Sequence, residues 1–360
     1  MPLPCLPPTA DPVGNAVDDA ATHDWRQPPS ARTGRRGFTR ALAAAGAAGL
    51  LGAPASRAQG SWPSRPIRLV IPFPAGGATD IIGRVVAIKL SQALGQQVVV
   101  DNRPGAGGTI GADAVAKAAP DGYTLLLATS STHSIGPVLN PKMPYDAIRD
   151  FTPIINVAEA PSVLLVGASF PAADARALIT LLKGAPGRYN FGSSGIGTYP
   201  HLSAEMFKWR AGNLFVVHIP YRGTGLVIPD LVTGQIAFLM DSIVSAQPHI
   251  RDGKVRALAV SGARRSSSLP NVPTFAEVGV QGMQISNWFG MFGPPGLAAD
   301  VVARVNREMN TLIASADVIE RFEKTGAEPR GGTPQAFAKL YADEMQSWKG
   351  VIQRANIRPE

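Results

Sequence analysis

The sequence predicts an α/β protein of two lobes, each a mostly parallel sheet flanked by helices, joined by a two-strand hinge. From Ile67 onward, short aliphatic runs alternate with amphipathic stretches, as strands and helices do in such sheets. Two glycine-rich turns, at 72–80 and 192–201, each join a strand to a helix and begin 120 residues apart. The strands expected at 157–166 and 287–292 each lie between two blocks of this pattern, and two such crossings make a hinge.

The N-terminal residues 1–58 have the pattern of an export signal. Arg35 and Arg36 precede Gly-Phe and an uncharged apolar stretch at 41–55, which favours the twin-arginine route. That stretch is shorter than the roughly 20 residues of a membrane-spanning helix. Small residues on both sides of Arg57 predict cleavage after Ala58. We therefore expect an exported, periplasmic protein.

Composition narrows the classes of function. Residues 59–360 carry 28 Lys and Arg against 22 Asp and Glu, a net charge of +6 that suits attraction of small anions. These basic residues are scattered, which argues against nucleic-acid binding. Cys5 is the only cysteine and would be removed with the signal. Disulfides, thiolate nucleophiles and cysteine-based metal sites are therefore excluded.

The first block of the pattern reads as strand, helix, strand, helix, strand. Continuous apolar runs predict strands at 67–71, 97–101 and 124–128, and such runs are typical of strands covered on both faces. Amphipathic spacing predicts the intervening helices at 79–94 and 109–118. This order is that of a parallel sheet.

The second block continues the alternation. Strands are expected at 160–166, 190–191, 215–218, 236–240 and 257–260, and helices at 173–183, 200–209, 225–233 and 245–251. After the strand at 287–292, a Pro/Gly stop precedes two helices at 299–315 and 334–355. The two crossing strands therefore place one lobe at 62–160 plus 284–360 and the other at 161–283.

No catalytic or cofactor signature is complete in this chain. The run 192–196 approaches a hydrolase nucleophile elbow, but Ile196 stands where that motif requires glycine. The clusters at 105–110 and 195–200 lack the third glycine of a dinucleotide fingerprint, and no Walker lysine follows them. The histidines have no metal-ligand spacing. We predict no catalytic residue, cofactor or metal; a hydrolase using Ser194 with His201 is the enzymatic alternative.

The candidate ligand site lies at the carboxyl ends of the predicted strands, where open α/β sheets bind ligands. A helix that begins after a glycine turn offers free backbone N–H groups and the positive end of its dipole to an anion. Ser, Thr and Gly in neighbouring turns add hydroxyl donors and allow close backbone approach. The candidate ligand-binding residues are Phe73, Gly76, Gly77, Ala78, Thr79, Asp80, Ser130, Ser131, His133, Ser193, Ser194, Gly195, Gly197, Thr198, His201, Arg222 and Asp241.

Six short motifs recur in one known family. They are WPSRPI at 62–67, the turn at 72–80, DNRPGAGG at 101–108, PDGYT at 120–124, HIPYRG at 218–223 and LPNVPT at 269–274. Together they resemble the Bug (TctC-like) family, the periplasmic substrate-binding components of tripartite tricarboxylate transport systems. The resemblance covers residues 61–360.

The resemblance implies a periplasmic-binding-protein (Venus-flytrap) fold that closes on a small organic carboxylate, either a di- or tricarboxylate or an aromatic acid. It implies delivery of this ligand to the membrane subunits of a transporter, without a reaction. Presentation of the carboxylate to a sensor-kinase ectodomain is the alternative. We expect a monomer, since the protein must close and dock.

The resemblance also implies roles for single residues. Thr79, Ser194 and Thr198 would donate to carboxylate oxygens, with backbone N–H groups of the same two turns. Asp80 would cap the helix, orient a water, or read a hydroxyl or ammonium group of the ligand. Arg222 stands where the family commonly has lysine, and its guanidinium would add a bidentate carboxylate contact. The run 131–133 also departs from the family pattern, which bears on the shape of the pocket.

Overall fold

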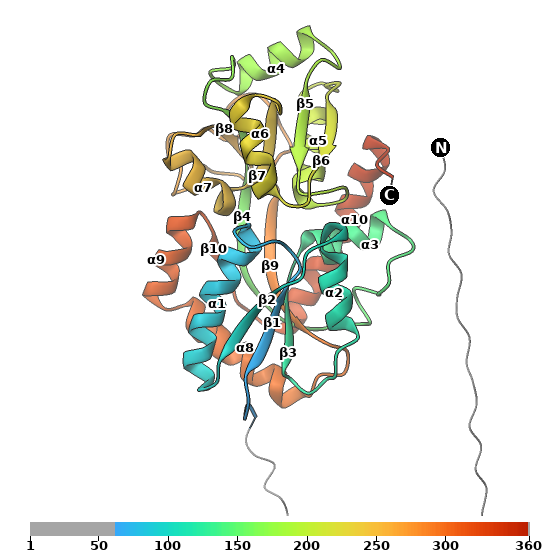
Figure 1. The fold of residues 1–360 in the computed structure, drawn as a ribbon, viewed down its shortest axis with the longest axis vertical. Helices are drawn as coiled ribbons and strands as arrows, with labels where there is room; N and C mark the ends of the chain where they lie inside the picture. The colour runs from blue at the N-terminus through green and yellow to red at the C-terminus, as the bar shows by residue number, and fades with distance from the viewer. Residues whose placement is uncertain (1–61, 359–360) are drawn as a thin grey trace, which may run out of the picture. The chain divides into compact units, whose positions relative to one another are not determined.

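The computed structural model describes residues 62–358. The predicted export signal, its cleavage site and Cys5 lie outside the described residues. In the described part of the chain, strands and helices alternate as predicted, and the strands follow the order β2-β1-β3-β9-β4-β7-β5-β6, with β8 and β10 also paired to β4 (Figure 1). In this part of the chain, no helix is both long and apolar enough to cross a membrane.

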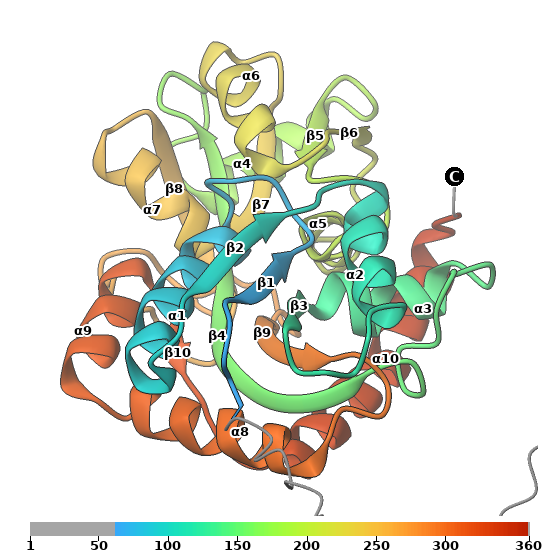
Figure 2. The ribbon, with the colours of Figure 1, turned by 60° about the horizontal axis from the view of Figure 1, so that its bottom comes forward.

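The first half of the sheet is built around three parallel strands. Its strands are β1 (Ile67–Ile71), β2 (Val98–Asn102), β3 (Thr124–Thr129), β9 (Ser286–Gly293) and the short β10 (Glu328–Pro329). Both β2 and β3 pair parallel to β1, whereas β9 runs antiparallel to β3. The helices of this half are α1 (Ala78–Leu94), α2 (Thr109–Ala116), α3 (Gly136–Leu139), α8 (Ala299–Ile313), α9 (Ala316–Thr325) and α10 (Pro334–Ala355). Figure 2 shows α1, α8 and α9 on one face of the sheet, and α2 and α10 on the other.

The second half of the sheet repeats the alternation with shorter strands. Its strands are β5 (Asn190–Ser193), β6 (Val217–Pro220), β7 (Phe238–Ser242) and β8 (Val255–Val260). Its helices are α4 (Ala175–Gly184), α5 (Tyr199–Arg210), α6 (Val227–Thr233) and α7 (Ile243–Arg251). Strand β5 pairs parallel to both β6 and β7.

One long strand, β4 (Thr152–Gly167), belongs to both halves. Residues up to Pro161 pair antiparallel with β9, and residues from Ser162 pair antiparallel with β7 and β8. Strand β9 begins at this change of partner, since Ser286 is opposite Pro161. The lobe limits predicted from the sequence stay a prediction, and the change of partner at Pro161 supports them.

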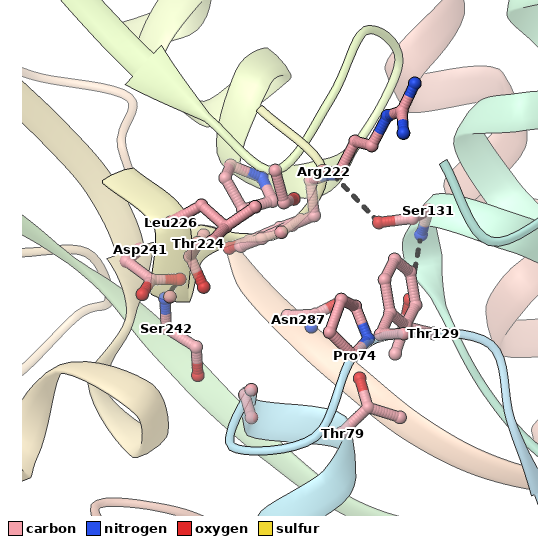
Figure 3. Close-up of a pocket in the computed structure, with 18 of the residues that line it drawn as sticks. Pro74, Thr79, Thr129, Ser131, Arg222, Thr224, Leu226, Asp241, Ser242 and Asn287 are labelled. Atoms are coloured by element: carbon pink, nitrogen blue, oxygen red, sulfur yellow. Dashed lines mark hydrogen bonds between the residues drawn. The ribbon is translucent and has the colours of Figure 1, made fainter. Parts of the chain in front are cut away.

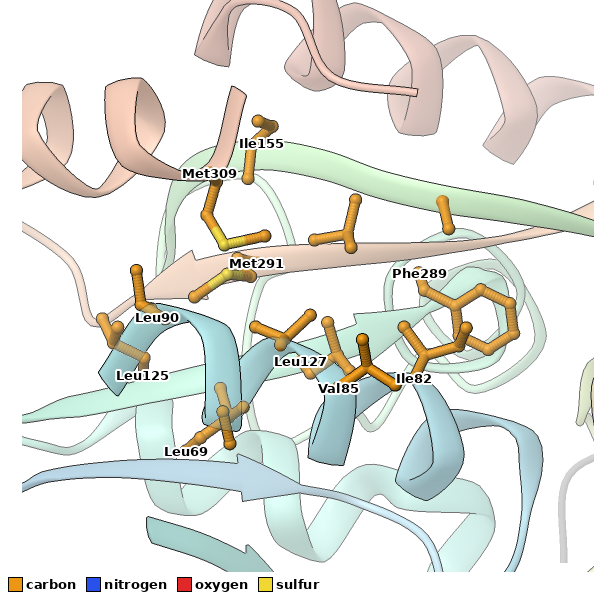
Figure 4. Close-up of a cluster of buried hydrophobic side chains, with 14 of the residues drawn as sticks. Leu69, Ile82, Val85, Leu90, Leu125, Leu127, Ile155, Phe289, Met291 and Met309 are labelled. Atoms are coloured by element: carbon orange, nitrogen blue, oxygen red, sulfur yellow. The ribbon is translucent and has the colours of Figure 1, made fainter. Parts of the chain in front are cut away.

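Each half has an apolar core on both faces of its sheet. The largest core packs α1, α8 and α9 onto β1, β3, β4 and β9; Figure 4 shows Leu69, Leu127, Phe289 and Met291 among its side chains. On the opposite face, Phe337 of α10 packs with aromatic residues of β9. These cores hold the strand ends of the first half in place, and the site is built on those ends.

Several elements of the fold differ from the sequence prediction, two helices among them. The predicted helix at 299–315 ends at Ile313, and a separate helix, α9, follows Ser315. The predicted helix at 225–233 begins with a 3₁₀ turn (Thr224–Leu226) before α6. The second difference matters for function because that turn lies at the cleft.

Gly290 of β9 provides a test of this packing. An added Cβ would lie 1.9 Å from Phe337 Cζ, so α10 rests directly on the strand backbone. We expect Gly290→Ala to lower the free energy of unfolding by about 1–3 kcal/mol, because overpacking displaces the helix. Denaturant unfolding measures the change.

The matched control is Gly350→Ala on an open side of α10, where an added Cβ has no neighbour within 4 Å. It should stabilise the protein by about 0.4–1 kcal/mol. Phe337→Leu in the Gly290→Ala background should recover part of the loss. Equal effects of the two glycine substitutions would contradict the packing argument.

Candidate functional site

A cavity of about 310 Å³ lies between the two halves, at the carboxyl ends of β1, β3, β5 and β7. Most of its lining comes from the turns that follow these strands and β6, and Asn287 comes from the start of β9 (Figure 3). The lining residues are Phe73, Pro74, Ala75, Gly77, Ala78, Thr79, Thr129, Ser131, Ser194, Tyr199, Pro200, Arg222, Gly223, Thr224, Gly225, Leu226, Asp241, Ser242 and Asn287. We call this space the inner cavity.

The start of α1 forms one wall of the inner cavity. Gly77 is the N-cap, with extended backbone (φ −76°, ψ 167°) and no capping side chain, so the first N–H groups of the helix have no intrahelical acceptor. The backbone N–H groups of Ala78 and Thr79 and the hydroxyl of Thr79 lie at this helix start. Thr79 is only 5% exposed, so its hydroxyl is already shielded from bulk water. The arrangement suits an anion at the positive end of the helix dipole.

Asp80 lies under this turn rather than in the cavity lining. Its Oδ2 accepts hydrogen bonds from the backbone N–H of Gly76 and from Arg84 Nε (both 2.9 Å), and its Oδ1 accepts one from Asn102 Nδ2 (3.0 Å). Burial raises the pKa of Asp80, but the hydrogen bonds from Arg84, Gly76 and Asn102 outweigh it and hold the pKa below its usual value. Asp80 therefore shapes the turn, and Gly76 gives its N–H to Asp80.

The turn between β5 and α5 is held by a second polar network. Ser193 Oγ lies 2.6 Å from His218 Nε2, and Thr198 Oγ1 donates to the carbonyl oxygen of Gly195 (2.7 Å). The backbone N–H of Gly197 donates to His201 Nδ1 (3.1 Å). Ser193, Thr198 and His201 are all buried and outside the lining of the inner cavity. They therefore set the shape of the turn that presents Ser194.

A second, outer cavity of about 600 Å³ adjoins the inner one. The two share Phe73, Pro74, Ser131, Ser194, Arg222 and Gly223 as lining residues. Gly195 and Gly197 face this outer cavity, together with the glycine turn at 105–108. Arg222 lies at the border, and its guanidinium points away from the centre of the inner cavity (Figure 3).

The two halves touch directly around the cavities. The backbone N–H of Tyr199, at the start of α5, donates to Ser131 Oγ, which follows β3 (2.9 Å). Gly223 has φ +120°, and an added Cβ would lie 2.9 Å from Pro74 Cγ of the opposite half. An added Cβ at Gly197 would lie 2.4 Å from Leu139 Cδ2. The structure therefore shows the cleft closed, with glycines at the points of closest approach.

Asp241 lines the inner cavity at the end of β7. Its side chain is 3% exposed; Oδ1 accepts from the backbone N–H of Ser242 (2.8 Å) and Oδ2 from Ser245 Oγ (2.7 Å). Burial raises the pKa of Asp241 to about 6, and the hydrogen bonds from Ser245, Ser242 and Thr224 oppose the rise. Asp241 and Arg222 are the only charged side chains in the lining of this cavity, within the residues the structure describes.

The other candidate residues lie away from both cavities. Ser130 Oγ donates to Glu344 Oε1 (3.1 Å). His133 is completely buried among the rings of Phe151, Phe292 and Tyr145. The candidate residues do not include several lining residues of the inner cavity, although most of these lie in the turns expected at this edge of the sheet: Pro74, Ala75, Thr129, Tyr199, Pro200, Gly223, Thr224, Gly225, Leu226, Ser242 and Asn287. Most of these residues directly follow a predicted strand, and this position in the sequence is the signal that could have identified them.

His201, which the enzymatic alternative pairs with Ser194, hydrogen-bonds the backbone of the turn in this structure. His201 Nδ1 accepts from the backbone of Gly197, and its Nε2 lies 4.0 Å from Glu205 Oε1, which Lys208 pairs at 2.6 Å. His201 is therefore hydrogen-bonded through Nδ1 to the backbone of the turn, and at 4.0 Å its Nε2 is beyond hydrogen-bond distance of Glu205. Between residues 62 and 358, no group of three or more His, Cys, Asp and Glu is arranged to hold a metal ion.

The chain is similar to known solute-binding proteins. The model of the family described as "Tripartite tricarboxylate transporter family receptor" (TctC) matches residues 82–357. Protein BugT of Bordetella pertussis is 40% identical over 299 residues, 83% of this chain and 91% of that protein. The structure of R. palustris Rpa4515 with adipate has a TM-score of 0.81 at 35% identity, covering 83% of this chain and all of that one. MatC from Rhodopseudomonas palustris with bound malate has a TM-score of 0.77 at 33% identity, covering 81% of this chain and all of that one.

Closure of the cleft can be tested at Gly223. We expect Gly223→Ala to disfavour the closed arrangement by about 1–3 kcal/mol, because alanine is strained at φ +120° and its Cβ meets Pro74. The radius of gyration from small-angle X-ray scattering should increase relative to the unchanged protein. Gly225→Ala is the matched control, since its Cβ has no neighbour within 4 Å. An unchanged radius for Gly223→Ala would contradict close approach at this point.

The buried histidines predict a loss of stability in acid. Burial lowers the pKa of His201 to about 2 and that of His218 to about 4, with the charge of Lys208 adding to both shifts and the neighbouring imidazole adding to that of His201. Below pH 6.5 the unfolded chain binds protons that the folded protein excludes. Each of these two histidines should therefore lower the free energy of unfolding by about 2 kcal/mol as the pH falls from 6.5 to 5.

Denaturant unfolding at pH 7.5, 6 and 5 measures this slope. His201→Asn should make it shallower, because asparagine does not titrate and its Oδ1 keeps an acceptor for Gly197. His249→Asn, at a half-buried position, is the control and should change the slope less. Parallel pH profiles for the original protein and His201→Asn would exclude this role of His201.

Proposed function

Because the chain belongs to the tripartite tricarboxylate transporter receptor (TctC/Bug) family of periplasmic solute-binding proteins, we propose that it captures a small organic carboxylate between its two lobes. The observation that carries the proposal is the inner cavity against the start of α1 in a closed cleft. A volume of about 310 Å³ lies at the lower end of the range for small-molecule sites. The bound malate and adipate of the two solved relatives belong to the same chemical class.

The proposed grip on the carboxylate uses neutral donors. Ala78 and Thr79 of the first half and Ser194 of the second line the inner cavity, and their N–H and hydroxyl groups are the proposed donors. Neutral donors at a helix start bind an anion without a paired lysine or arginine. A ligand held by both halves stabilises the closed arrangement, so capture and closure are one step.

We propose that the closed form then delivers its ligand to the membrane subunits of a transporter, acting as a periplasmic monomer after export. The alternative is presentation of the carboxylate to a sensor-kinase ectodomain. Capture of the ligand-bound protein by either membrane partner separates the two, since both use the same ligand site.

Thermal unfolding against mono-, di- and tricarboxylates, amino acids and neutral sugars tests the ligand class. A ligand at about 100 times its dissociation constant adds roughly 2.7 kcal/mol to the free energy of unfolding. We expect stabilisation by carboxylates and none by sugars. Stabilisation by sugars alone would overturn the proposal.

Thr79→Val tests the helix start directly. Valine keeps the shape of threonine but removes the hydroxyl donor, so affinity for the carboxylate should fall about fivefold to twentyfold, or roughly 1–1.8 kcal/mol. Isothermal titration calorimetry measures the change. Thr180→Val on α4, far from the cavity lining, is the matched control and should leave affinity unchanged. Equal affinities for all three proteins would remove Thr79 from the site.

A further inference from the structure

Asp241 is a buried carboxylate that faces the inner cavity without a cationic partner. Its hydrogen bonds come from neutral donors: the backbone N–H of Ser242 and the hydroxyls of Ser245 and Thr224. By contrast, Asp80 at the other helix start is paired with Arg84 at 2.9 Å. Burying a carboxylate without a counter-charge costs free energy. Asp241 therefore carries a desolvation cost that Arg84 offsets for Asp80.

The lining of the inner cavity offers both donors and acceptors. The start of α1 and the hydroxyls of Thr79 and Ser194 are donors. Asp241 supplies carboxylate oxygens, and Asn287 carries a buried Oδ1 that has no hydrogen-bond partner within the described residues. Figure 3 shows Asp241 and Ser242 across the cavity from Thr129 and Ser131. A ligand that fills this space therefore meets both kinds of group.

We propose that Asp241 accepts a hydrogen bond from a hydroxyl or ammonium substituent of the ligand, so that the protein selects hydroxy- or aminocarboxylates over unsubstituted acids of the same length. This inference rests on the proposed carboxylate-binding function. Asn287 adds a second polar group to the lining of the cavity. An unsubstituted acid leaves Asp241 buried and unpaired in the closed cleft, which weakens its binding.

In the alternative arrangement, Asp241 is protonated and its hydroxyl donates a hydrogen bond to a carboxylate of the ligand. It predicts the reverse selectivity, since an unsubstituted diacid would then bind best and bind more tightly as the pH falls. Arg222, whose guanidinium points away from the centre, is the only other charged group lining the inner cavity in the described part of the chain. The pH dependence of affinity between pH 5 and 8 therefore reports mainly on Asp241 and on the ligand itself.

The test is isothermal titration calorimetry with two matched series at pH 7.5. One series is succinate, malate and aspartate; the other is glutarate, 2-hydroxyglutarate and glutamate. We expect a substituted acid to bind at least tenfold more tightly than the unsubstituted acid of its length. Asp241→Asn should reduce this preference to less than about threefold. A larger loss for the amino acid than for the hydroxy acid identifies an ammonium group as the preferred donor, and the reverse identifies a hydroxyl.

Asp252→Asn, an exposed position in the same half, is the matched control and should keep the preference. Should Asp241→Asn not fold, the unchanged protein is titrated from pH 8 to pH 5. The preference for the substituted acid should then shrink with falling pH, as Asp241 takes up a proton.

The outcomes separate this inference from the function on which it rests. Binding of all six acids without preference, or preference for the unsubstituted acids, overturns the role of Asp241 and leaves carboxylate capture standing. An absence of binding by these six acids and by every other carboxylate of the thermal panel overturns both.

Discussion

The hydrogen bonding of β4 is the constraint on which the cleft depends. One strand of 16 residues is paired to β9 along its first part and to β7 and β8 along its second, so each half of the sheet ends on the same backbone. This shared strand brings the carboxyl ends of β1 and β3 opposite those of β5 and β7. The turns that follow these strands then face one another, and the inner cavity is the space that they enclose.

Both glycine-rich turns at the cleft are shaped by buried polar groups that do not line the inner cavity. Asp80, with Arg84 and Asn102, supports the turn before α1. His201 and His218, stacked at 3.8 Å, support the turn before α5 through Gly197 and Ser193. Their hydrogen bonds fix the glycine turns from beneath, so the backbone donors need little rearrangement when a ligand arrives. Such preorganisation lowers the entropic cost of binding.

The sequence predicted the bounds of an element best where the apolar pattern lies within that element alone. Strand β1 and helix α10 have the predicted bounds, because a continuous apolar run and a Pro-initiated amphipathic stretch each determine their own limits. Helix α9 was missed because the prediction ends a helix at Ser315 and assigns no element to the amphipathic stretch after it. Among the candidate residues, Gly77, Thr79 and Ser194 line the inner cavity, and their binding of a ligand stays a prediction. Asp80 and His133 do not line it, because the direction of a side chain depends on partners distant in sequence, such as Asn102 and Phe292.

The two aspartates show how the same side chain acquires different roles from its surroundings. Asp80 has a guanidinium partner, so closure of the cleft changes little in its electrostatic energy. Asp241 has only neutral hydrogen-bond partners among the described residues. When the cleft closes and excludes water, no counter-charge offsets the desolvation cost of its carboxylate. A ligand that brings a donor to Asp241 offsets this cost, and one that brings none stabilises the closed form less. Selectivity at Asp241 would therefore act through closure itself, because the ligand that completes the hydrogen bonding of the cavity is also the one that keeps the two halves together.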